Sequence, residues 1–401
     1  MAQQLTQQQQ LAMLNAQARQ AINAVAVARL QISQTNSYAA IGTANISQSQ
    51  PVVNHIPRMV GLIRGFYVKI AATITNGSAV QIDLTDFGPS NLLSQIQFTD
   101  LQNNQRVQTT GWHIAFLNSV KQRRPYGSAF VRTTGFDDPI NFGSNWTGQI
   151  QAPATIPAAG TASVIMWYYV PLAYSDKDLR GAVYANVVNA TMQLNLTFNP
   201  LPVVDNGADA TAAVYQGDVA GTTALAVISA ATVTIYQDYL DQLPVGQAGV
   251  ILPPLDISTI YDIKNTLVTA IVANQDFPVQ YANYRDFLST FAVYVNTAAG
   301  GLRGVGADVN FWAQQTANYT NIWKAGPDMV ALRTRNHLGV DMPPGAYYFS
   351  NRERPISTLQ YGNVELVLNA ITAGTGAYLL LGFESFAMMN QVVNAGSLPA
   401  S

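Results

Sequence analysis

Few side chains in this chain of 401 residues are suited to catalysis or metal binding. Histidine, the usual general base and metal ligand near neutral pH, occurs only at His55, His113 and His337, and cysteine does not occur. The histidines are too far apart in the sequence to show the spacing of a zinc site. No metalloprotease, serine-hydrolase or phosphate-binding motif occurs either. The sequence therefore predicts no catalytic site, no metal and no cofactor, and we expect His113 in a core or an interface.

Aspartate is the remaining source of ligand chemistry, because close Asp pairs occur in segments expected to be loops. The pairs are Asp137 with Asp138, Asp176 with Asp178, and Asp205 with Asp209. Such carboxylates could bind Ca²⁺ between subunits, which requires about six to eight oxygen ligands. No calcium-binding loop motif is present, and Asp is favoured in turns because its side chain hydrogen-bonds the nearby backbone. The turn interpretation is favoured, with Lys177 and Arg180 left to pair with these carboxylates locally or across a subunit boundary.

Basic residues gather in two short clusters. Lys121 stands with Arg123 and Arg124, and Arg333 stands with Arg335. Nucleic-acid binding would need more charge, interleaved with aromatic residues on one surface. We expect these clusters to form salt bridges between subunits, or to contact lipid headgroups if they lie at the base of an assembly.

The composition points to a protein that associates with copies of itself. Charged residues make up only 10% of the chain, where an ordinary soluble domain has about 25%. Hydrophobic residues make up 48%, which is enough for a core and excludes overall disorder. The net charge of −2 excludes overall electrostatic attraction to nucleic acid. Because a surface so poor in charge is weakly protected against association, we expect other subunits to cover it.

Residues 1–50 are predicted to form a helical arm. Apolar residues recur there every three or four positions in a segment rich in alanine and glutamine, which is typical of an amphipathic helix. No acidic residue precedes Asp83, so the arm is positively charged. The helix is predicted to contact a lipid surface or, alternatively, to pack on the chain's own body or on a neighbouring subunit. The residues assigned to it are Leu11, Leu14, Arg19, Ile22, Val25, Arg29 and Ile32.

After Pro51 the helical spacing gives way to short runs typical of β-strands. Apolar residues alternate in the run 66–70 and again in the run 192–198, and Gly, Pro, Asn and Asp separate such runs throughout. Many short strands at regular spacing predict an all-β fold, and this length suggests two sandwiches. The predicted domains are a first sandwich at 51–245, a second at 246–390 and a tail at 391–401.

The same order of elements occurs twice along the chain, which suggests a duplication. The segments paired in this comparison are 86–100 with 276–296, 167–175 with 346–355, 194–198 with 364–369, and the strand ending at Tyr239 with the strand at 377–386. The run 163–170 is apolar on both faces. Met166, Tyr168 and Val170 lie on one face, and Ile165, Trp167 and Tyr169 lie on the other. One of these two faces is therefore expected against the other sandwich, a neighbouring subunit or a covering loop.

Five long segments resemble the major capsid proteins of tectiviruses, within the lineage of membrane-containing icosahedral bacteriophages. They are LTDFGPSNLL (84–93), VPLAYSDKDLRGAVYANV (170–187), IYQDYLDQLPVGQAGVILP (235–253), VQYANYRDFLST (279–290) and TLQYGNVELVLN (358–369). The resemblance implies a double jelly roll, with two eight-stranded sandwiches side by side. It also implies pseudo-hexagonal trimers that tile an icosahedral shell around an internal membrane and double-stranded DNA.

Further expectations follow from the same resemblance. The N-terminal helix would face the internal membrane at the base of the trimer, and vertex and minor capsid proteins would be partners. The chain would belong to the outer shell of the virion, assembled in the host cytoplasm, with no enzymatic activity and no sequence-specific binding of nucleic acid. The alternative function is a glycan- or receptor-binding spike, for which Trp146, Trp312 and Trp323 are the candidate contact residues. An enzyme on a jelly-roll scaffold is third, because neither half offers enough histidines.

Overall fold

The computed structural model describes thirteen segments of the chain, and nearly all of their regular structure is β-strand. The segments are 36–46, 50–85, 87–122, 152–175, 178–185, 191–199, 203–204, 213–217, 226–240, 259–296, 308–316, 320–338 and 345–388. The predicted arm helix, the tail 391–401 and the boundary predicted near residue 245 lie outside these segments. They remain predictions.

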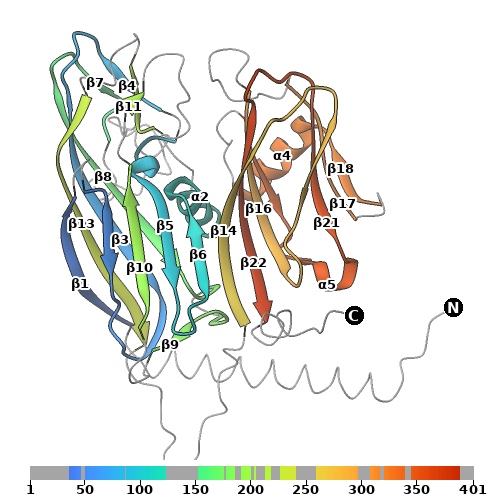
Figure 1. Cartoon of the computed structure of the whole chain (residues 1–401), viewed down its shortest axis with the longest axis horizontal. Helices are drawn as coiled ribbons and strands as arrows, with labels where there is room; N and C mark the ends of the chain where they lie inside the picture. Colours follow the sequence, from blue (N-terminus) through green and yellow to red (C-terminus); the bar gives the residue numbers. More distant parts are fainter. Residues whose placement is uncertain are drawn as a thin grey trace, which may run out of the picture.

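The first sandwich consists of two facing sheets, drawn upright on the left of Figure 1. One sheet joins β1, β13, β3 and β8 in that order, with the short β9 (Val183–Tyr184) beside β3, and the other joins β6, β5, β10 and β2. The strands are β1 (Asn36–Ile46), β2 (Val52–His55), β3 (Leu62–Asn76), β5 (Leu93–Thr99), β6 (Gln105–Thr109), β8 (Thr161–Pro171), β10 (Gln193–Phe198) and β13 (Ala226–Leu240). A small separate sheet contains β4 (Ile82–Leu84), β7 (Thr155–Ile156), β11 (Val203–Val204) and β12 (Tyr215–Gly217).

The second sandwich is built in the same way and stands beside the first (Figure 1). One sheet joins β14, β22, β16 and β19, with the short β20 (Ile356–Ser357) beside β16, and the other joins β15, β21, β17 and β18. The strands are β14 (Thr259–Thr269), β15 (Asp276–Gln280), β16 (Asp286–Val295), β17 (Val309–Thr316), β18 (Asn321–Ala325), β19 (Ala346–Ser350), β21 (Val364–Ala370) and β22 (Tyr378–Met388).

Both sandwiches have jelly-roll topology. If the eight main strands of each are numbered in chain order, one sheet reads 1-8-3-6 and the other reads 2-7-4-5 in both halves. A helix follows the fifth strand in each: α2 (Gly111–Gln122) after β6 and α4 (Pro327–Leu338) after β18. The predicted double jelly roll with two eight-stranded sandwiches is therefore confirmed. The sequence pattern predicted neither these two helices nor the short α5 (Thr358–Tyr361) and the 3-10 helix η1 (Gly88–Leu92).

Two sequence-based predictions are corrected by the topology. Asn36–Ile46, predicted as part of the helical arm, is the edge strand β1 and pairs with β13 along its length. Six of its eleven residues are Ala, Asn or Gly, which are depleted in strands, so the pairing with β13 rather than the composition makes it a strand. In the duplication, three of the four matched segments are equivalent strands. The first is not, because 86–100 holds the fourth strand of its sandwich and 276–296 holds the second and third.

The two sandwiches share one sheet. β6 of the first pairs in parallel with β14 of the second, through Val107 with Ile263 and Gln108 with Lys264. The result is a continuous nine-stranded sheet that crosses the junction between the sandwiches. Each strand contributes alternate side chains to a core: in β3, Phe66, Val68 and Ile70 are fully buried, as their alternation predicts. The shared sheet positions the contacts described next.

Candidate functional site

The predicted site residues fall into two groups. The seven residues of the arm, Leu11, Leu14, Arg19, Ile22, Val25, Arg29 and Ile32, lie outside the described segments, so their membrane-facing role is untested. Within the described segments, no cluster of His, Asp and Glu has the geometry of a metal site. The same segments contain no helix long and apolar enough to span a membrane. The contacts described next lie between the two sandwiches. We call this contact region the seam: β6 and α2 of the first sandwich meet β14, β16 and β22 of the second there.

Helix α2 forms the centre of this seam because both of its faces are apolar. Its fourth residue, Ile114, is buried in the first sandwich, and its third and sixth, His113 and Phe116, reach the second sandwich. Both rings contact Phe291, with ring centroids 5.3 Å and 5.4 Å apart. Gly382 lets His113 come this close, since a Cβ on that glycine would lie 2.4 Å from the imidazole. His113 is therefore a core residue, as predicted.

A buried carboxylate connects the two sandwiches electrostatically. Glu384 on β22 is fully buried. It accepts hydrogen bonds from Tyr261 Oη at 2.5 Å, Ser289 Oγ at 2.7 Å and Arg352 Nη2 at 2.8 Å. From the first sandwich, Lys121 Nζ at the end of α2 lies 3.5 Å from the same carboxylate. Charge-assisted hydrogen bonds of this kind stabilise a buried ion only when every partner is present.

The surroundings keep this carboxylate ionised. Burial alone would raise the pKa of Glu384, but the nearby charges of Arg352 and Lys121 and the donated hydrogen bonds lower it to about 2. Lys121 also donates a hydrogen bond to the Tyr174 carbonyl oxygen at 2.7 Å and lies over the Tyr261 ring. Lys121 was predicted to pair between subunits or with lipid. That prediction is corrected, because its ionic partner lies in the same chain.

Protonation of His113 should weaken the seam. Burial lowers the pKa of His113 from 6.5 to about 3, and the nearby charge of Glu384 opposes this shift only partly. Because the unfolded chain takes up a proton at higher pH than the folded chain does, this residue's contribution to stability is complete above about pH 6.5. It should be lost towards pH 3 at up to about 1.4 kcal/mol per pH unit. Urea unfolding at several pH values across this range gives the free energy of unfolding as a function of pH. That free energy should fall less steeply with falling pH for His113→Gln than for the parent chain. Equal slopes would contradict the assignment.

The outer face of the β1–β13–β3–β8 sheet carries a row of half-buried aromatic residues. Tyr67 and Tyr169 pack with ring centroids 4.6 Å apart, and Trp167 stacks on Tyr236 at 5.7 Å. The indole Nε1 of Trp167 is buried without a hydrogen-bond acceptor among the described residues. This face points away from the second sandwich (Figure 1). The sequence predicted that the other sandwich, a neighbouring subunit or a loop covers one face of this strand. For this face, the structure excludes the other sandwich of the same chain.

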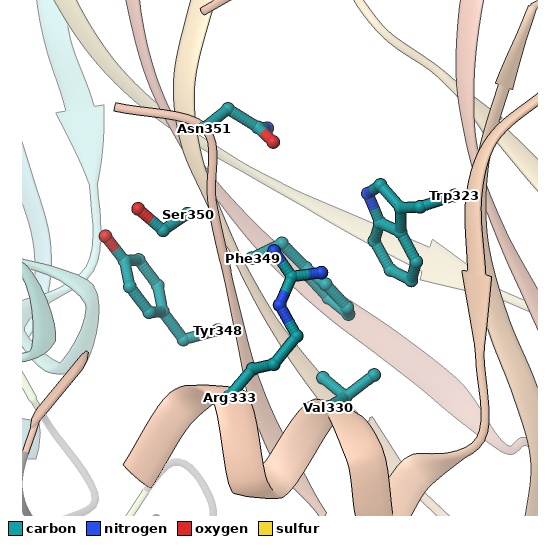
Figure 2. Close-up of a pocket in the computed structure, with 7 residues that line it drawn as sticks. All are labelled: Trp323, Val330, Arg333, Tyr348, Phe349, Ser350 and Asn351. Atoms are coloured by element: carbon teal, nitrogen blue, oxygen red, sulfur yellow. The ribbon is translucent and has the colours of Figure 1, made fainter. Parts of the chain in front are cut away.

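A cleft opens at the free edge of the second sandwich, between β18, α4 and the segment after β19. It is lined by Arg333, Arg354, Ile322 and Tyr361, among others. A smaller pocket continues from it, and Figure 2 shows the Arg333 side chain rising from α4 into this pocket. Neither Arg333 nor Arg354 has an ionic partner among the described residues.

The remaining predicted residues are placed as follows. Arg180 pairs with Asp178 at 2.6 Å, so the local alternative is the one observed there. Trp312 is fully buried, and Trp323 is half-buried and stacked on Phe349, so neither offers an open platform for a sugar ring. Trp146, Asp176, Lys177 and the Asp pairs at 137–138 and 205–209 lie outside the described segments, as do Arg123 and Arg124.

Sequence reasoning missed the residues that matter most at the seam. The sequence did indicate that Glu384 is unusual, because it is one of only three glutamates and interrupts the apolar run AYLLLGFESF. Two further buried pairs, Arg64 with Asp238 at 2.6 Å and Arg106 with Asp100 at 2.6 Å, join residues whose partnership depends on strand pairing or a tight turn. No sequence spacing indicates such pairs.

Comparison with known proteins gives one consistent result. A model of the N-terminal part of P3 major capsid proteins matches residues 1–243, and a model of the C-terminal part matches residues 258–400. The major capsid protein P3 of Enterobacteria phage PRD1 is 43% identical over 403 residues, covering 99% of this chain and 98% of that protein. Among solved structures, the STIV MCP aligns with a TM-score of 0.61 at 10% identity, covering 88% of this chain and 97% of that chain. A chain in the atomic structure of Sulfolobus Turreted Icosahedral Virus aligns with a TM-score of 0.61 at 11% identity, covering 91% and 94%.

Proposed function

This chain belongs to the P3 major capsid protein family, and from that premise we propose that its copies form trimers which tile an icosahedral shell around an internal membrane and a double-stranded DNA genome. The function as a major capsid protein rests on one observation, the 43% identity with the PRD1 protein along the whole chain. The family is structural, so the chain is a building block of a virion shell and not an enzyme.

Two features of the molecule support assembly as trimers. Only 10% of the residues are charged, which suits flanks that become buried between subunits, because charged residues are depleted in interface cores. The aromatic outer face of the first sandwich and the cleft of the second lie on different flanks of the chain. A head-to-tail contact between two such different surfaces closes into a ring when the rotation between subunits permits.

The arm is proposed to contact the membrane enclosed by the shell. Its amphipathic spacing and positive charge fit the headgroups of anionic lipids, although two arginines contribute only about 1 kcal/mol each. Vertex and minor capsid proteins are proposed as further partners, with assembly in the host cytoplasm. We propose no sequence-specific contact with nucleic acid.

Deleting residues 1–34 should leave the trimer intact and reduce binding to membranes. Both sandwiches as described begin after this segment, at β1, so removing it leaves all described strand pairings in place. The measurement is flotation with anionic phospholipid vesicles, together with the solution mass of the truncated chain. A truncated chain that floats as well as the full chain would contradict the membrane role. A truncated chain that is monomeric would assign the arm to contacts between subunits instead.

A further inference from the structure

A row of polar side chains crosses the outer face of the β2–β10–β5–β6 sheet and continues onto β14. These strands lie side by side (Figure 1). On either side of Asn195 in β10, Leu194 and Leu196 are buried in the core, so Asn195 itself points outwards. Strand pairing aligns it with the other members of the row, which we call the amide row: Asn54, Asn195, Gln97, Gln108 and Lys264.

The face around the amide row is polar and carries one charge. The other outward residues of these strands, identified by the same alternation, are Val52, Gln95, Thr99, Gln105, Gln193 and Thr197. Lys264 is the only charged residue among them and the amide row, and none is aromatic. The face therefore offers hydrogen-bonding groups on a flat sheet, with a single cation at one end.

Two groups of the amide row have no partner in the part of the chain that the structure describes. Lys264 is half-buried and has no carboxylate within ion-pair distance there, and burial alone lowers its pKa. The side-chain oxygen of Asn195 is buried and accepts no hydrogen bond from the described residues. Polar groups left in this way are costly, so both favour a binding partner that satisfies them.

The spacing of these two groups limits what can bind both. β10 and β14 are separated by β5 and β6, and neighbouring strands lie about 4.8 Å apart, so Asn195 and Lys264 are about 14 Å apart. A single molecule that satisfies both must present a hydrogen-bond donor and an anionic group at about that distance.

The chemistry of the face favours a polypeptide as the bound molecule. Nucleic acid would need several cations interleaved with aromatic residues, and a lipid surface would need a broad apolar face. A polypeptide supplies backbone N–H donors for amide oxygens, and an acidic side chain supplies a carboxylate for Lys264. Two copies of this chain meeting by this same face would bring no carboxylate to Lys264, because the face contains none.

We propose that the amide row binds an extended acidic segment of another shell protein, which lies across the strands. A carboxylate of that segment pairs with Lys264, and a backbone N–H donates to Asn195. Because an extended chain advances about 3.3 Å per residue, these two groups are about four residues apart in the partner. The inference rests on the proposed function for the presence of other shell proteins, and it adds which face binds one of them and by what chemistry.

Photocrosslinking in assembled virions tests this binding. Gln97, at the centre of the amide row, is replaced by the photoreactive residue p-benzoylphenylalanine, and the irradiated virions are digested for mass spectrometry. We expect a crosslink to another shell protein, at a segment with Asp or Glu within about four residues of the crosslinked position. The matched control is the same replacement at Gln81, which is exposed before β4 on the small separate sheet. The control should not give this product.

Substitutions of Lys264 separate binding from chain stability. Lys264→Met should reduce the yield of the Gln97 crosslink by at least about fivefold, because the partner's carboxylate loses its cation. Lys264→Arg keeps the charge and should retain most of the yield. Neither substitution should lower the free energy of unfolding measured in urea, because Lys264 has no ionic partner to lose in the described part of the chain.

The outcomes distinguish this inference from the proposed function. Virions that assemble but give no crosslink from Gln97, nor from the same replacement at Gln95, would overturn the inference. Crosslinks only to other copies of this chain, or an unchanged yield with Lys264→Met, would also overturn it. All of these results leave the proposed function standing, whereas a parent chain that does not enter virion shells would contradict the proposed function itself.

Discussion

Replacing Glu384 by glutamine should lower the free energy of unfolding by about 3 to 5 kcal/mol, because it leaves two cations at the seam without their shared anion. Arg352 and Lys121 both depend on this carboxylate, and Glu384 is fully buried, so water cannot replace it. Urea unfolding at neutral pH measures the loss. The matched control is Glu365→Gln on β21, whose carboxylate is half-buried and whose loss should cost well under 1 kcal/mol.

Removing the cations together with the anion separates the role of charge from that of packing. The triple variant Glu384→Gln, Arg352→Met, Lys121→Met should recover part of the stability lost in Glu384→Gln, because apolar side chains of similar length leave no uncompensated charge. If Glu384→Gln were as stable as its control, the charged cluster would not be what connects the two sandwiches.

Phe291→Ala should be the most damaging apolar substitution at the seam, with a loss of about 3 to 5 kcal/mol. Phe291 is 1% exposed and packs against His113 and Phe116 of the first sandwich and Tyr348 of its own. Truncation leaves a cavity between two sandwiches that are joined by a shared sheet, so the surrounding side chains can collapse only partly.

Tyr67 provides the comparison, because it occupies on β3, the third strand of the first sandwich, the position that Phe291 occupies on β16, the third strand of the second. Tyr67→Ala removes a ring that is half-buried within one chain, so the loss for the isolated chain should be clearly smaller than for Phe291→Ala. Its main effect is expected on association, as weaker trimers at low protein concentration. Unfolding curves and dilution experiments on both variants distinguish the two effects. Equal losses of chain stability would contradict the assignment of Tyr67 to a contact between copies.

The strands and the number of sandwiches could be predicted because they depend on local patterns. Alternation at Phe66, Val68 and Ile70 marks a half-buried strand whatever its partner, and turn residues separate the strands at regular intervals. The order of the strands was less accessible, and the match of 86–100 to 276–296 failed for this reason. Strands with similar alternation do not indicate their position within a sheet, which is decided by pairing over long sequence separations.

The seam could not be predicted because its residues come together only in the folded chain. Lys121 and Glu384 are far apart in the sequence, and although the apolar run around Glu384 indicates burial, no nearby residue identifies Lys121 as its partner. Helix α2 was missed because apolar residues lie on both of its faces, so it lacks the one-sided pattern of a surface helix. The equivalence of Tyr67 and Phe291 depends on the register of four strand pairs, which the sequence does not contain.

The solution mass of the purified full-length chain, measured by light scattering on a sizing column at moderate salt, tests the central claim most directly. A block of two joined sandwiches, with the exposed apolar residues Met329 and Leu332 on α4 and an aromatic face on the β1–β13–β3–β8 sheet, should give a mass of three chains. Adding a chelator should not change that mass, because the contacts proposed between copies involve no metal. A stable monomer at the same concentration would contradict the account.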